Sequence, residues 1–210
     1  MNKDEVLKTM AEKRLVPVIR TATADDARWA IETLAEAGIS VFEITLTIPN
    51  AVELIRESKP NLLIGAGTVL TIDQAKASAD AGAKFIVSPI FEKQVVDFCD
   101  QNGLCVMPAG LTPTEIYNAW QSGADVVKVF PCGAIGGASY IKAVKSVFPD
   151  IKLMPTGGVN AETIKSFLDA GAIAAGAGTD LVDSNLVKTR NAEALKQRAE
   201  SFLKKLTANS

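Results

Sequence analysis

Histidine is absent from this sequence of 210 residues. Hydrolytic triads, zinc-activated water and most acid–base sites depend on imidazole, so any chemistry must use lysine, glutamate, aspartate, arginine or tyrosine. Cysteine is scarce, with three residues, Cys99, Cys105 and Cys132. Because their number is odd and they lack CxxC spacing, they do not form a disulfide or zinc framework, and we expect them to be small fillers of the core or of a site. The sequence therefore implies no metal and no cofactor.

Long hydrophobic runs are absent as well. No stretch of about 18 apolar residues is available to cross a bilayer. The first fourteen residues are charged throughout and lack the apolar region of a signal peptide. The 22 basic and 24 acidic residues give a net charge of −2 and are scattered, so no basic stripe favours nucleic acid. We expect a cytoplasmic protein with no membrane and no nucleic-acid partner.

Short apolar runs rich in β-branched residues alternate with amphipathic stretches, which is typical of βα units and a parallel sheet. We expect eight strands, at Leu15–Arg20, Val41–Leu46, Leu62–Thr68, Phe85–Pro89, Leu104–Ala109, Val126–Pro131, Lys152–Thr156 and Ile173–Gly176. Helices are expected to begin near Ala24, Asn50, Thr71, Glu92, Thr112, Ala138, Asn160 and Thr189. Recurring phrases such as "EAGIS" and "DAGAK" place a glycine where each helix ends before the next strand.

The length fits a single domain, residues 1–210, and eight βα units close naturally into an α/β fold of the (β/α)8 TIM-barrel type. Residues 3–13 are predicted to form an additional N-terminal helix that covers the bottom of the barrel. An open doubly wound sheet is the alternative, but no GxGxxG opens a first βα turn. Functional residues are expected at the carboxyl ends of the strands.

Lys128 interrupts the apolar sixth run, where strand alternation places it on one face with Val126 and Phe130. If the opposite face meets the helices, the lysine points into the barrel. Burial favours a neutral amine, which is a nucleophile able to form a Schiff base with a ketone. The alternatives are a structural ion pair with a carboxylate, or a side chain that reaches solvent at the barrel mouth.

Glu43 occupies the same kind of position in the second run, on the interior face together with Thr45 and Thr47. An unpaired interior carboxylate is costly. Glu43 is therefore expected to neutralise a cation such as Lys128 or to move protons, and the two roles are compatible.

Arg20 ends the first run, and a guanidinium at a barrel mouth suits a substrate carboxylate. A salt bridge between Arg20 and Glu43 is the alternative. Thr68, which ends "IGAGT", is placed to offer a hydroxyl to the same carboxylate.

Two glycine-rich loops, "MPTGGVN" and "AGAGTDL", follow the seventh and eighth runs. Exposed backbone N–H groups in such loops bind anions, and TIM barrels often bind phosphate at this pair of loops. The alternative is that the glycines only permit tight turns. Together the loops favour a site for phosphate or a second anionic group.

Seven segments along nearly the whole chain carry a family resemblance: "VPVIR", "FEITL", "IGAGTV", "FIVSP", "VKVFP", "MPTGGVN" and "GAGTDLV". With them the sequence resembles the class I aldolases acting on 2-keto-3-deoxy-6-phosphogluconate (KDPG) and 4-hydroxy-2-oxoglutarate (KHG). The combination of "VKVFP" with a glutamate in the second strand is specific, whereas many barrels share the glycine-rich loops.

The resemblance implies that Lys128 forms a carbinolamine and then a Schiff base, while Glu43 shuttles protons. Cleavage of the C3–C4 bond then gives pyruvate and an aldehyde such as glyceraldehyde 3-phosphate or glyoxylate. The resemblance also implies that the protein assembles as a homotrimer. We expect substrate contacts from Arg20, Thr47, Thr68, Pro89, Phe130 and Thr156, and phosphate contacts from Gly157, Gly158, Gly178 and Thr179.

One departure from the family pattern concerns Thr47, which stands where the KDPG-cleaving enzymes carry the arginine of "TLRT". Members acting on 2-keto-3-deoxy-6-phosphogalactonate (KDPGal) also lack this arginine, which leaves the preferred stereochemistry at C4 open. Two other functions compete with the aldolase. One is a metal-free phosphosugar isomerase or epimerase, and the other is a non-catalytic barrel that binds a sugar acid.

Overall fold

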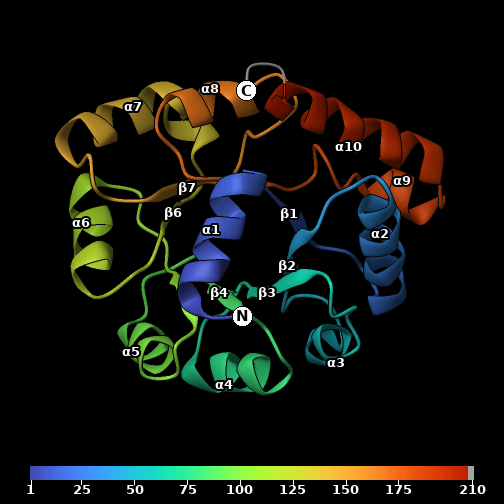
Figure 1. The fold of residues 1–210 in the computed structure, drawn as a ribbon, viewed down its shortest axis with the longest axis horizontal. Helices are drawn as coiled ribbons and strands as arrows, with labels where there is room; N and C mark the ends of the chain where they lie inside the picture. Colours follow the sequence, from blue (N-terminus) through green and yellow to red (C-terminus); the bar gives the residue numbers. More distant parts are fainter. Residues whose placement is uncertain (208–210) are drawn as a thin grey trace.

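The computed structural model describes residues 1–207 and consists of parallel strands that alternate with helices (Figure 1). The strands are β1 (Leu15–Ile19), β2 (Val41–Thr45), β3 (Leu63–Gly67), β4 (Phe85–Val87), β5 (Cys105–Met107), β6 (Val127–Val129), β7 (Leu153–Pro155) and β8 (Ala175–Ala177). The helices are α1 (Lys3–Lys13), α2 (Ala24–Glu36), α3 (Ala51–Arg56), α4 (Ile72–Asp80), α5 (Lys93–Gln101), α6 (Pro113–Gln121), the 3-10 turn η1 (Gly133–Ile135), α7 (Gly137–Val147), α8 (Ile164–Asp169), α9 (Ser184–Lys188) and α10 (Ala192–Thr207).

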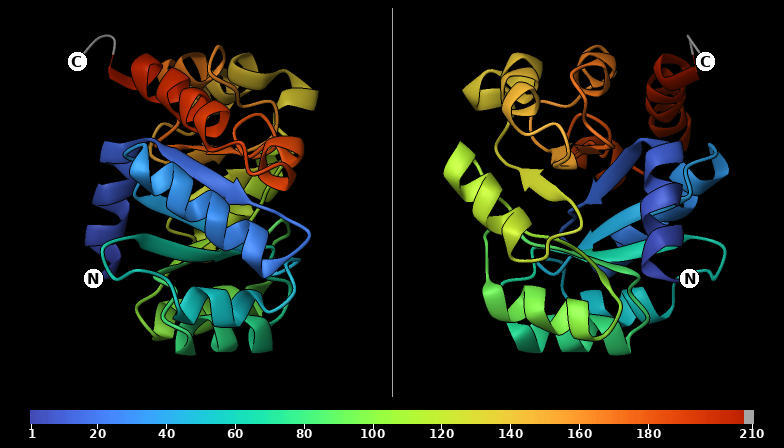
Figure 2. Two further views of the ribbon diagram at one scale, coloured as in Figure 1. Left: turned by 90° about the vertical axis from the view of Figure 1, so that its right-hand side faces the viewer. Right: turned by 60° about the vertical axis from the view of Figure 1, so that its left-hand side comes forward.

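All strand pairs are parallel, and the eight predicted strands are confirmed. Six form a sheet in the order β5-β4-β3-β2-β1-β8, while β6 and β7 pair separately. Single bridges, Ala109 to Lys128 and Thr156 to Gly176, connect the two sheets. The result is an α/β fold whose parallel sheet curves into half a barrel, with helices on its outer side (Figures 1 and 2).

Several strands are shorter than predicted because prolines follow them closely. Pro108 comes directly after β5, and Pro131 comes two residues after β6. Proline has no N–H to donate to a ladder, so regular pairing stops there. Backbone bonds nevertheless join the two strands, because the Lys128 N–H donates to the Pro108 carbonyl at 2.9 Å. Lys128 is therefore held by a neighbouring strand as well as by β7.

Helix α1 confirms the helix predicted at residues 3–13. Asn2 caps it in a capping box with Glu5, and the helix ends at Arg14, whose φ is 61°. Val6 and Met10 are buried and pack on the first residues of several strands, among them Val16, Val41, Leu63 and Phe85. Each such side chain contributes about 1.5–3 kcal/mol of burial. The interior at this end is thus apolar, which leaves the opposite end for polar residues.

Two predicted helix starts differ from the bounds of the helices. Asn160 lies before α8, which begins at Ile164, but its side chain caps the intervening turn by accepting from the N–H groups of Glu162 and Thr163, and its carbonyl accepts from the Ile164 N–H at 2.9 Å. A helix near Thr189 was also misplaced, since α9 comes before it and α10 after it. The Asp183 side chain starts α9 by accepting from two backbone N–H groups of its first turn.

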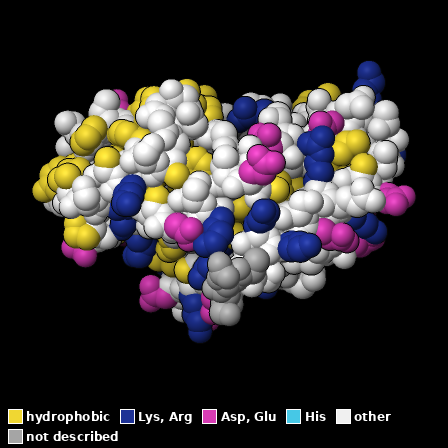
Figure 3. All heavy atoms as spheres, turned by 90° about the horizontal axis from the view of Figure 1, so that it is seen from above, with side chains coloured by type: hydrophobic (Ala, Val, Ile, Leu, Met, Phe, Trp, Pro, Cys, Tyr) yellow, Lys and Arg dark blue, Asp and Glu magenta, His cyan; other side chains and the backbone are white. Residues whose placement is uncertain are grey.

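The surface carries mixed charges. Seen from above, acidic and basic side chains lie side by side, with no large area of one sign on this face (Figure 3). Among residues 1–207, no helix combines the length and the apolar character that crossing a bilayer requires.

Candidate active site

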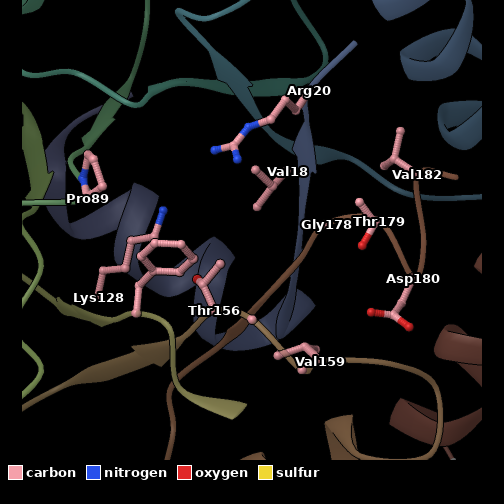
Figure 4. A pocket seen from close by; sticks show the side chains of 13 residues that line it. Val18, Arg20, Pro89, Lys128, Thr156, Val159, Gly178, Thr179, Asp180 and Val182 are labelled. Carbon is pink, nitrogen blue, oxygen red and sulfur yellow. The ribbon is translucent and has the colours of Figure 1, made fainter. Parts of the chain in front are cut away.

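A cavity of about 200 Å³ opens at the carboxyl ends of the strands (Figure 4). Its walls come from segments far apart in the sequence: the end of β1, the loop after β4, strand β6, and the loops after β7 and β8. The lining residues are Val18, Arg20, Pro89, Lys128, Phe130, Thr156, Gly157, Gly158, Val159, Gly178, Thr179, Asp180 and Val182. Nine of the predicted site residues therefore share one cavity.

Lys128 reaches this cavity from β6 and pairs with Glu43 of β2, which is buried and does not itself line the cavity. Its Nζ lies 3.5 Å from Glu43 Oε1, and the two residues are 3% and 0% exposed. The Lys128 ammonium also stands 5.6 Å from the ring centre of Phe130. A cation and a carboxylate are thus both removed from water, which is favourable only because they face each other.

Neither oxygen of Glu43 accepts a hydrogen bond from any described residue. Buried carboxylates normally accept several bonds, so an unsatisfied one is poised to accept from a bound molecule. The ion pair with Lys128 is the contact that the sequence predicted for Glu43. The alternative pairing of Glu43 with Arg20 is not found in residues 1–207.

Gly67 gives the Glu43 carboxylate its space. Residue 67 pairs with Thr45 across β2 and β3, and a Cβ added at Gly67 would overlap the Glu43 side chain. We expect Gly67→Ala to lower the free energy of unfolding by about 1–3 kcal/mol, as overpacking does, and to displace Glu43 from Lys128. Denaturant unfolding and kcat measure the two effects.

The control for this substitution is Gly178→Ala, because a Cβ there would meet nothing within 4 Å. Its free energy of unfolding should match that of the native chain. If Gly67→Ala is as stable and as active as the native protein, then the space beside Glu43 is not restricted as described.

Arg20 extends from the end of β1 into the cavity (Figure 4). One of its nitrogens donates to Thr68 Oγ1 at 3.4 Å. Thr68 has a φ of 57°, which is strained for a β-branched residue and costs about 1–3 kcal/mol. This unusual backbone turns the Thr68 hydroxyl toward Arg20, so the two predicted carboxylate-binding residues do lie together.

Thr47 lies outside the set of cavity-lining residues, as does Thr68. Thr47 is exposed, and its hydroxyl lies 2.8 Å from that of Thr45, which donates to the Ile19 carbonyl at 2.9 Å. The substrate contact expected from Thr47 is therefore not supported by this geometry. The residue sits one strand away from Arg20, at the rim.

The glycine-rich loop after β7 packs tightly against the loop after β6. The Gly133 N–H donates to the Gly157 carbonyl at 2.9 Å, and a Cβ at Gly158 would come within 2.9 Å of the Gly133 backbone. Gly157 and Gly158 have φ values of 88° and 75°, which L side chains rarely adopt. Thr156, just before them, has a buried hydroxyl without a hydrogen-bond partner among the described residues.

Four lining residues were not predicted: Val18, Val159, Asp180 and Val182. Strand alternation places Val18 on the face of Arg20, and Asp180 belongs to the loop "AGAGTDL", so both carried a signal. Val159 and Val182 also belong to quoted segments, "MPTGGVN" and "GAGTDLV", but their apolar side chains gave no reason to expect a role in binding. No group of three metal-binding side chains occurs in the part of the chain that the structure describes.

The family model for KDPG and KHG aldolases matches residues 6–198. The chain belongs to this family. Among relatives, it is 34% identical to the 2-dehydro-3-deoxy-phosphogluconate aldolase of Haemophilus influenzae, with 89% of this chain and 90% of the relative covered. It is 35% identical to the 2-dehydro-3-deoxy-6-phosphogalactonate aldolase of Escherichia coli, with 90% and 93% covered.

A solved structure of another family member is also similar. It is the KDPG aldolase of Legionella pneumophila with pyruvate captured as a covalent carbinolamine, at 29% identity and a TM-score of 0.86, covering 94% of this chain and 97% of that one. Membership in the aldolase family favours the aldolase hypothesis over the isomerase and the binding protein.

Proposed function

We propose that this protein is a Schiff-base aldolase that reversibly cleaves KDPG, KDPGal or KHG to pyruvate and an aldehyde. The observation that carries the proposal is the buried Lys128, which lines the cavity and lies 3.5 Å from an otherwise unpartnered Glu43. A primary amine in this position serves as the nucleophile, and the adjacent carboxylate serves as the proton carrier.

The reaction begins when the neutral amine of Lys128 attacks the C2 carbonyl of the substrate. The resulting carbinolamine loses water, with Glu43 supplying and removing protons, and becomes a protonated imine. Glu43 then takes the proton of the C4 hydroxyl, the C3–C4 bond breaks, and its electron pair moves to the imine to form an enamine. The aldehyde leaves, C3 is protonated, and hydrolysis returns pyruvate and Lys128.

The remaining lining residues bind the two ends of the substrate. Arg20 and Thr68 hold the pyruvyl carboxylate, because a guanidinium and a hydroxyl converge there. Pro89 and Phe130 enclose the imine, and the orphaned hydroxyl of Thr156 bonds a substrate hydroxyl. The distal phosphate lies at the backbone N–H groups of Gly157, Gly158, Gly178 and Thr179.

Arg20→Ala should raise the KM for pyruvate in the reverse reaction by about tenfold or more, as for a lost hydrogen bond to a charged group. The increase in KM should be the same with phosphorylated and unphosphorylated aldehydes, since Arg20 binds the pyruvyl carboxylate and not the phosphate. Arg56→Ala, on the exposed side of α3, is the control and should leave KM unchanged. A loss confined to phosphorylated aldehydes would assign Arg20 to the phosphate site instead.

The fold proposed for this function is a closed (β/α)8 barrel made by the single domain of residues 1–210, with α1 as its floor. The two bridges between the sheets support closure. So do two backbone bonds that cross between them, from the Lys128 N–H to the Pro108 carbonyl at 2.9 Å and from the Ile173 N–H to the Leu153 carbonyl at 3.0 Å. A closed barrel holds β2 and β6 opposite each other, which brings Glu43 to Lys128.

A homotrimer is the proposed assembly. Exposed apolar side chains at the carboxyl-end rim support it: Leu70 follows β3, and Ile90 and Phe91 follow the adjacent β4, with 41%, 46% and 37% of each residue exposed. Such a cluster favours burial against another copy.

Sedimentation should give three times the chain mass, and Ile90→Lys should shift the measured mass toward that of the monomer. A native monomer would refute the assembly.

The three cysteines support a cytoplasmic location. Cys99, Cys105 and Cys132 are free and buried, as expected of core fillers. Burial raises the pKa of the Cys99 thiol to about 12 and that of Cys132 to about 11, which keeps both thiols protonated and unreactive. Free thiols of this kind are typical of proteins in a reducing compartment.

A further inference from the structure

A second cavity, of about 450 Å³, lies beside the catalytic one. Residues of the β1–α2 loop form one side, and α9 forms the other through Ser184, Asn185 and Lys188. Arg20 lines both cavities and is the residue that they share. The proposed function uses only its inner side.

The charges around this outer cavity are unequal. Its one acidic lining residue, Asp26, is already paired with Arg190 at 3.1 Å. Its two basic lining residues, Arg20 and Lys188, form no ion pair with any residue from 1 to 207. Two cations from separate elements therefore face a hollow in which the carboxylate is neutralised, and such an arrangement attracts an anion.

Arg20 has spare capacity for a second ligand. Its guanidinium offers five N–H donors and uses one of them in the long, 3.4 Å bond to Thr68. The residue is exposed, so its side chain can rotate about the end of β1. An oxyanion bound beside Lys188 would compete with Thr68 and with a substrate carboxylate for the same guanidinium.

We propose that the outer cavity is an inhibitory oxyanion site, at which a phosphate group bridges Lys188 and Arg20 and weakens pyruvate binding. The inference rests on the proposed function, because it assigns Arg20 to the pyruvyl carboxylate. The ligand class is a free phosphate or a phosphomonoester, and it acts without touching Lys128. The effect on pyruvate follows from shared use of one arginine.

The test measures how much pyruvate half-saturates covalent labelling of the protein by borohydride, with no aldehyde present. Inorganic phosphate should raise this concentration by about threefold or more relative to sodium chloride of equal ionic strength, which controls for screening. Lys188→Gln should abolish most of the phosphate effect and leave labelling without phosphate unchanged. Lys84→Gln, an exposed lysine far from the cavity, should keep the full effect.

The outcomes separate the two proposals. Absence of any pyruvate label refutes the Schiff-base function itself. Labelling that phosphate does not affect refutes the inhibitory site alone. A phosphate effect that survives Lys188→Gln also refutes it, since the anion would then act from the glycine-rich loops of the catalytic cavity.

Discussion

Replacing Lys128 with arginine should reduce kcat for aldol cleavage by about 10⁴-fold or more. Arginine keeps the positive charge that faces the buried Glu43, but a guanidinium does not deprotonate near neutral pH and cannot form the imine. Pyruvate release, followed by coupled reduction to lactate, measures the loss. The variant separates the covalent role of Lys128 from its role as a counter-ion.

Lys128→Met is the companion substitution and should also cost stability. It leaves Glu43, which is 0% exposed, as an unpaired buried charge, at a cost of about 3–5 kcal/mol. The control is Lys152→Arg, at the residue just before β7, whose Nζ lies over the ring of Trp120. This variant should retain full activity. Cleavage by Lys128→Arg at a tenth of the native rate would show that no imine is needed.

Glu43→Gln should lower the rate of aldol cleavage by about 10²-fold or more, as for a lost acid–base group. The amide is nearly the same size as the carboxylate, so the space left by Gly67 still accommodates it. Imine formation with pyruvate should persist or slow. Measuring both steps on one variant distinguishes proton transfer from simple charge balance. A near-normal cleavage rate would leave Glu43 as a structural partner of Lys128.

The main features of the fold follow from the sequence because strand and helix periods are local. Alternation along β2 and β6 was enough to place Glu43 and Lys128 on interior faces, since neighbouring side chains of a strand point to opposite sides. The carboxyl-end location of the cavity follows from the same parallel topology. Arg20 could be placed beside the cavity for this reason, although its strand ends one residue earlier than predicted.

Other features depend on contacts between segments that no local pattern specifies. The clearance between Gly67 and Glu43 depends on the register of β2 against β3, and the Thr45–Thr47 hydroxyl pair depends on where β2 ends. Strand alternation predicted that Thr47 lies on the interior face, together with Glu43 and Thr45. The chain leaves the strand after Thr45, however, and the alternation no longer applies beyond that point.

The central claim is tested most directly by the site of a covalent pyruvate adduct. The native protein is incubated with pyruvate and borohydride, its intact mass is measured, and the labelled peptide is mapped. We predict one adduct per chain, on Lys128, which is 3% exposed and lies next to Glu43. An isomerase or a binding protein would gain no adduct. A label on Lys84 or Lys152 instead, or no label at all, would contradict the Schiff-base mechanism.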